Sequence, residues 1–119
     1  MPLLWDAEAI DALTETVITR LLVRGDTARA VAMDLALGLS AVQPTLPALA
    51  LALPFTLAAS AIEEMLGAGA PARAAALDAW RIAALIGADA LMLKTEGDDS
   101  LAALAAQWKA GDEVFDAGS

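Results

Sequence analysis

The middle of this chain contains a long stretch without a single charged side chain, residues 35–62, which reads LALGLSAVQPTLPALALALPFTLAASAI. Apolar surface of this extent is stabilised by leaving water, so the stretch predicts the interior of the protein. Prolines at positions 44 and 47 predict a break near 43–47, because the residue before a proline disfavours the helical conformation. We expect a helix over about 47–66 at the centre of the fold, since this segment is apolar on all sides.

Pro54 lies inside this expected central helix. A proline in a helix interior costs roughly 3 kcal/mol and either bends the helix or breaks it. Two outcomes therefore remain open from the sequence, a kinked helix or two short helices that meet near Pro54.

Amphipathic helices are predicted on both sides of the neutral stretch. Apolar residues recur at helical spacing over residues 6–24, 27–42, 71–94 and 101–110. Capping residues support these bounds, because Asp6 begins the first segment and Gly97 follows the third. We therefore predict an all-α fold, a four- or five-helix bundle formed as a single domain over 1–119, with a polar C-terminal tail over 111–119.

Two segments of the chain resemble each other at an offset of 44 residues. Residues 27–42 read TARAVAMDLALGLSAV, and residues 71–86 read PARAAALDAWRIAALI. Chance similarity between alanine-rich segments is one interpretation. The other is a duplicated αα-hairpin, in which two similar helix pairs pack around a pseudo-two-fold axis.

The aligned charges of these two segments suggest structural ion pairs. In a duplicated fold, Arg29 faces Asp78 and Arg73 faces Asp34 across the axis. Arg81 lies three residues after Asp78 and is within reach of it on the same helix. Carboxylates among apolar residues can also serve acid–base chemistry. We favour ion pairing, since buried arginine–aspartate pairs commonly specify how helices pack.

The composition restricts the classes of function. A net charge of −9 and a pI near 4.1 disfavour contact with phosphate backbones and with anionic lipid headgroups. The chain has no cysteine and no histidine, which removes thiolate and imidazole groups from any site. The acidic residues at 63–64 and 98–99 lack the spacing of a calcium-binding loop. We therefore predict no metal, no cofactor, no nucleic-acid partner and no enzymatic activity.

Aromatic side chains are the remaining candidates for binding, and the chain has three tryptophans and two phenylalanines. Trp108 is expected on a short helix near the end of the chain, while Trp5 and Phe115 lie close to the two termini. Large aromatic residues dominate the energetics of many interfaces. These three residues are candidate interface residues, with packing in the core as the alternative.

Apolar residues make up 59% of the chain, and no catalytic constellation accompanies them. We predict a non-enzymatic interaction module that self-associates or serves as a small subunit of a larger assembly. One alternative is a carrier of a small apolar ligand, held in a cavity between helices. Another is a membrane-embedded subunit, since about 20 apolar residues can span a bilayer, although prolines interrupt the stretch here. The acidic N-terminus lacks the basic region of a secretory signal, so we expect a cytoplasmic location.

Overall fold

The structure of the chain is a computed structural model that describes residues 5–66 and 69–111. Within these ranges the chain forms five α-helices and one 3₁₀ helix, which are α1 (Ala7–Leu22), α2 (Ala28–Val42), η1 (Ala48–Leu51), α3 (Ala52–Leu66), α4 (Ala70–Glu96) and α5 (Leu101–Lys109). The predicted all-α bundle is confirmed. The other helices lie within two residues of their predicted bounds, but the segment expected as one helix over 47–66 is divided into η1 and α3. Most of the predicted C-terminal tail, residues 112–119, lies outside the described residues.

Short polar side chains and glycine set the helix ends. The Asp6 carboxylate accepts the backbone N–H of the third residue of α1 at 2.9 Å. The hydroxyl oxygens of Thr27 and Ser100 do the same for α2 and α5, each at 3.2 Å. Gly97 ends α4 with φ of 98°, a left-handed conformation that glycine adopts without a steric cost. Local sequence therefore accounts for the helix bounds.

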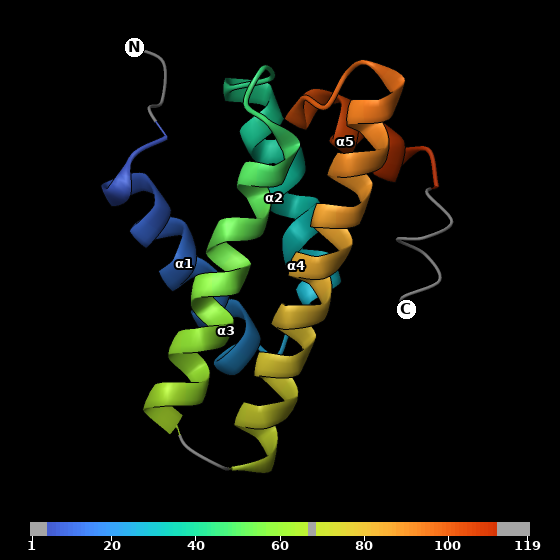
Figure 1. Cartoon of the computed structure of the whole chain (residues 1–119). Helices are drawn as coiled ribbons and strands as arrows, with labels where there is room; N and C mark the ends of the chain where they lie inside the picture. Colours follow the sequence, from blue (N-terminus) through green and yellow to red (C-terminus); the bar gives the residue numbers. More distant parts are fainter. Residues whose placement is uncertain (1–4, 67–68, 112–119) are drawn as a thin grey trace.

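Helices α3 and α4 form an antiparallel hairpin in the foreground of Figure 1, with α1 at the left beside α3 and with α2 and α5 behind the hairpin. Helix α1 packs against α3, while α2 packs mainly against α5, which turns back after Gly97. The core lies between the hairpin and these helices. Its largest fully buried side chains include Trp108, Phe55, Ile62 and Ile86.

The neutral stretch is buried on one side and exposed on the other. Leu51, Pro54 and Phe55 are fully buried, whereas Leu49 is 58% exposed and Leu53 is 38% exposed. The expectation that this stretch forms the interior of the protein therefore holds for one side of it only. Helix α3 is not enclosed by the other helices, because the hairpin forms an outer layer of the bundle.

Pro54 is the third residue of α3, directly after η1. The first N–H groups of an α-helix have no partner within the helix, so a proline in the first turn removes no hydrogen bond. The structure thus decides between the two outcomes left open by the sequence. A 3₁₀ turn runs into an α-helix, and the proline stands at their junction.

The segment between α2 and η1 forms backbone hydrogen bonds that hold the start of α5 against the rest of the fold. The backbone N–H of Ala48 donates to the carbonyl of Asp99 at 2.8 Å, and the N–H of Leu101 donates to the carbonyl of Leu46 at 2.6 Å. These bonds flank an isolated antiparallel bridge between Pro47 and Ser100. The segment that ends the first half of the chain therefore positions the start of the last helix.

The two halves of the chain do not pack alike. Helices α3 and α4 contact each other along most of their length, whereas α1 and α2 touch at few points. A duplicated αα-hairpin would show the same packing in both pairs. The structure therefore gives no support to the duplication that the 44-residue offset suggests.

Candidate interaction surface

A row of residues with small and large apolar side chains runs along the outer side of α4. Leu77, Trp80, Ala84, Gly87 and Leu91 follow one another at alternating spacings of three and four residues, which keeps them on one side of a helix. Leu77 is 48% exposed, Trp80 is 38% exposed and Leu91 is 65% exposed. Large apolar groups left in water on a single helix face are the unusual feature of this structure.

A second apolar row lies on the adjacent segment of the hairpin. Leu49, Leu53 and Leu57 recur at four-residue spacing along η1 and α3, and each is more than one third exposed. The two rows meet at one end of the hairpin, and a side-chain hydrogen bond joins α4 to α3 toward the other end. Leu49 and Leu91 line one pocket, and at the other end the indole N–H of Trp80 donates to the carboxylate of Glu63 on α3.

We call the exposed surface formed by these two rows the hairpin face. Its large apolar members are Leu49, Leu53, Leu57, Leu77, Trp80 and Leu91. The hairpin face was not foreseen from the sequence, because its leucines belong to the stretch expected inside the protein or to a helix whose buried side was not assigned. The signal that could have found it is the alternating three- and four-residue spacing along α4.

A hollow interrupts the hairpin face beside Gly87. Its walls come from Leu49, Gly87, Ala90 and Leu91, and Lys94 and Asp99 stand at its edge. A Cβ atom at Gly87 would lie 3.9 Å from the Cδ1 atom of Leu49, an ordinary contact distance, so the missing side chain leaves space here.

The charges of the hairpin differ from those of the whole chain. Helices α3 and α4 carry three of the seven basic residues and five of the sixteen acidic residues, a net charge of −2 out of −9. Arg73, Arg81 and Lys94 of α4 form no ion pair with any residue that the structure describes. The hairpin therefore offers basic groups that the acidic remainder of the described chain does not neutralise.

Arg20 is the centre of the ion pairs seen in the structure. Its Nε atom lies 2.8 Å from Asp26, and its Nη1 atom lies 2.8 Å from Asp34. These hydrogen bonds, first to Asp26 and then to Asp34, raise the pKa of Arg20 above its ordinary value. The prediction that Asp34 pairs with Arg73 is therefore wrong, because Asp34 is held by α1 instead of α4.

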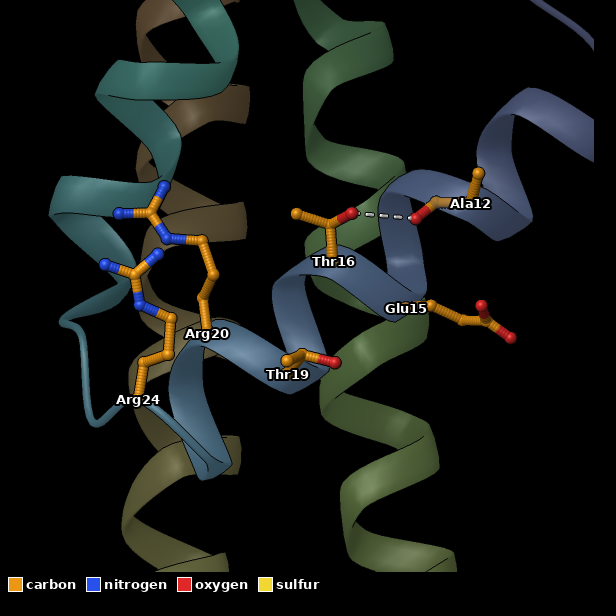
Figure 2. Close-up of a pocket in the computed structure, with 6 residues that line it drawn as sticks. All are labelled: Ala12, Glu15, Thr16, Thr19, Arg20 and Arg24. Atoms are coloured by element: carbon orange, nitrogen blue, oxygen red, sulfur yellow. Dashed lines mark hydrogen bonds between the residues drawn. The ribbon is translucent and has the colours of Figure 1, made fainter.

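A shallow depression adjoins Arg20, and Figure 2 shows its lining residues on and just after α1, which are Ala12, Glu15, Thr16, Thr19, Arg20 and Arg24. The two guanidinium groups extend toward α2 and away from Glu15 (Figure 2). The Thr16 hydroxyl donates to the carbonyl of Ala12 at 3.0 Å, so it serves its own helix. Because Arg20 forms ion pairs with two aspartates, we interpret this cluster as a structural link between α1 and α2.

Asp78 links α4 to the beginning of α2. Its carboxylate accepts the backbone N–H of Ala28 at 2.7 Å, the first N–H of α2 and one that has no partner within that helix. Arg29 and Arg81 line one pocket together with Asp78, so the structure brings these three predicted residues together. The predicted ion pair between Asp78 and Arg81 is wrong, because Arg81 pairs with no residue that the structure describes, whereas a pair between Asp78 and Arg29 stays a prediction.

Trp108 lies in the core and not on the surface, which corrects the expectation of an interface residue. It is only 2% exposed, and its indole N–H donates to the carboxylate of Asp89 at 2.7 Å. Asp89 is itself 3% exposed, so the bond joins α5 to α4 inside the protein. Trp5 is half-buried against the core, and Phe115 lies outside the described residues.

The described residues contain no group of three acidic side chains that could hold a metal ion. The acidic pairs at 63–64 and 98–99 lie near opposite ends of the hairpin, too far apart to share a ligand. Within the same part of the chain, no helix has the length and apolar character needed to cross a membrane. Comparisons with family models, with curated proteins and with solved structures returned no match.

Proposed function

We propose that this protein is a non-enzymatic helical interaction module, and that its hairpin face binds a second copy of the same chain. The observation that carries the proposal is the set of six large apolar side chains exposed on this face. Burying one leucine side chain fully contributes about 1.5–3 kcal/mol, so covering several of them would offset the cost of association.

Charge supports a second copy as the partner. Most of the acidic residues lie outside the hairpin, so two hairpins can meet without bringing the bulk of the −9 charge together. The hairpin carries charges of both signs at each end, with Glu63, Glu64 and Arg73 at one end and Lys94 and Glu96 at the other. When two copies pack antiparallel, each end can place its basic group near an acidic group of the second copy, which makes the surface self-complementary.

Sedimentation velocity over a range of concentrations tests this proposal with the variant Leu91→Gln. Leu91 is 65% exposed, so about two-thirds of its burial energy remains to be gained, and a symmetric dimer loses it twice. The total is about 3 kcal/mol, a roughly 100-fold rise in Kd.

The matched control is Val23→Gln, because Val23 is 79% exposed but lies directly after α1, outside the hairpin face. We expect this variant to associate as the unchanged chain does. The proposal fails if the unchanged chain is monomeric at every concentration, or if both variants behave alike.

The hollow beside Gly87 supports a second candidate function, the carriage of a small apolar molecule. Its walls are apolar, and Lys94 and Asp99 carry opposite charges at its edge, so the apolar walls are the surface that would hold the ligand. Native mass spectrometry after gentle purification would show the added mass of such a ligand, and Gly87→Leu would remove it by filling the space. Absence of any added mass in the unchanged chain would contradict this function.

A cytoplasmic location is part of the main proposal, and fractionation of cells that express the tagged chain tests it.

A further inference from the structure

We infer that the two copies pack antiparallel through α4, with the two-fold axis at Ala84 and with Trp80 of each copy lying over Gly87 and Ala88 of the other. This inference rests on the proposed function, and it adds the orientation and register of the contact.

The register follows from residue sizes along the outer side of α4. Leu77 and Leu91 each lie seven residues from Ala84, in opposite directions along the helix. A two-fold axis at Ala84 therefore places Leu77 against Leu91 of the second copy, and Ala84 against Ala84. The small central residue allows the two helices to approach closely, and the large residues pack on either side of it.

Trp80 distinguishes this arrangement from a parallel one. In the antiparallel register Trp80 faces Ala88 of the second copy and lies beside the hollow at Gly87, whose apolar walls offer the indole ring a surface to pack against. In a parallel pair, Trp80 would meet Trp80 and Gly87 would meet Gly87. That arrangement crowds two indoles at one level and leaves an unfilled gap at the other, and both defects are unfavourable.

Charge gives an independent reason for the same orientation. In the antiparallel register Arg73 faces Thr95 of the second copy, the residue before Glu96, and Lys94 approaches Glu63, which is held next to Trp80 by a hydrogen bond. A parallel pair would set Arg73 against Arg73 and Lys94 against Lys94. Exposed pairs of this kind contribute little to affinity, but they select orientation because like charges repel.

The chain has no cysteine, so single-cysteine variants report this geometry without further changes. We would prepare Ala84→Cys, Leu77→Cys and Leu91→Cys, and oxidise each with diamide, which takes up the two electrons and two protons that two thiols release on forming a disulfide. Ala84→Cys should cross-link to itself. Leu77→Cys and Leu91→Cys should cross-link to each other at least tenfold more than either does to itself.

A charge-reversal series gives a second readout that needs no cross-linking. Arg73→Glu should raise Kd about three- to tenfold in the antiparallel register, and the double variant Arg73→Glu/Glu96→Arg should restore it. In a parallel pair, residue 73 of one copy would lie beside residue 73 of the other, and residue 96 beside residue 96. The double variant would still place like charges together and would not restore Kd. Circular dichroism of each variant checks that the fold is retained.

The outcomes separate this inference from the proposed function. A dimer in which Leu77→Cys and Leu91→Cys each cross-link to themselves overturns the antiparallel register and leaves the hairpin face as the interface. A dimer in which none of the three positions cross-links places the interface elsewhere and overturns both. A chain that is monomeric by sedimentation at every concentration also overturns both.

Discussion

The buried bond between Trp108 and Asp89 gives a quantitative prediction for Trp108→Phe. The substitution removes the indole N–H that donates to the Asp89 carboxylate at 2.7 Å inside the core. Removing the donor of this buried hydrogen bond costs about 1–3 kcal/mol, and the smaller ring loses about 1–2 kcal/mol of packing. We expect unfolding to become easier by about 3–4 kcal/mol, a large part of the 5–15 kcal/mol typical of a domain.

Urea unfolding followed by far-ultraviolet circular dichroism measures this loss. With a urea dependence of about 1.5 kcal/mol per M, the midpoint should fall by roughly 2 M while the slope stays unchanged. Because self-association would stabilise the folded state, all variants should be compared at one concentration and in the Leu91→Gln background.

Trp80→Phe is the matched control, because it deletes the same N–H from a tryptophan that is 38% exposed and bonded to Glu63. Solvent can replace that bond, so we expect a loss of about 1 kcal/mol or less. A double-mutant cycle of Trp108→Phe with Asp89→Ala should show a coupling of at least about 1 kcal/mol. If Trp108→Phe costs no more than Trp80→Phe, the reasoning about the buried bond is refuted.

Three further predictions concern the other contacts between elements and at helix ends. Asp78→Ala removes the acceptor for the first N–H of α2, and urea unfolding should show a loss of about 1–3 kcal/mol, whereas Asp78→Asn should lose less. Gly97→Ala places a Cβ at φ of 98° and should destabilise the protein by about 1–2 kcal/mol. Gly38→Ala, in the open middle of α2, should instead stabilise the protein by about 0.5–1 kcal/mol. Equal effects of the two substitutions would contradict the conformational argument. Hydrogen bonds from the Ser100 side chain and backbone lower the pKa of Asp98. This carboxylate therefore favours the folded state at neutral pH, and it loses that effect as pH falls through its pKa. NMR titration should show that Ser100→Ala raises the pKa of Asp98, and an unchanged pKa would exclude the hydroxyl as a cause.

Local features of the sequence were sufficient to predict the helices. Apolar spacing, N-cap residues such as Asp6 and Thr27, and the glycine at position 97 act within one or two helical turns, so they are readable without knowledge of the fold. The predicted break near 43–47 was also local, because prolines restrict the residues next to them.

Pairings between distant residues could not be read in the same way. Asp34 pairs with Arg20 and not with Arg73, and the bond of Trp108 to Asp89 joins helices whose relative placement no local pattern specifies. The 44-residue offset offered a symmetry for assigning partners, but the two helix pairs pack differently. Residue type showed that these groups needed partners, and only the packing chose which ones.

By itself, the sequence determined the helical class, the helix ends and the absence of thiol and imidazole groups, because these depend on residue type and on neighbours along the chain. The tertiary structure alone decided which side of each apolar helix faces the core and which faces water. Alanine and leucine on every side of a helix leave that choice open, and it is settled when α3 and α4 pack into an outer hairpin with Leu53 and Leu91 exposed. For that reason, Trp108, which was expected at an interface, lies in the core, and the apolar hairpin face is the candidate site.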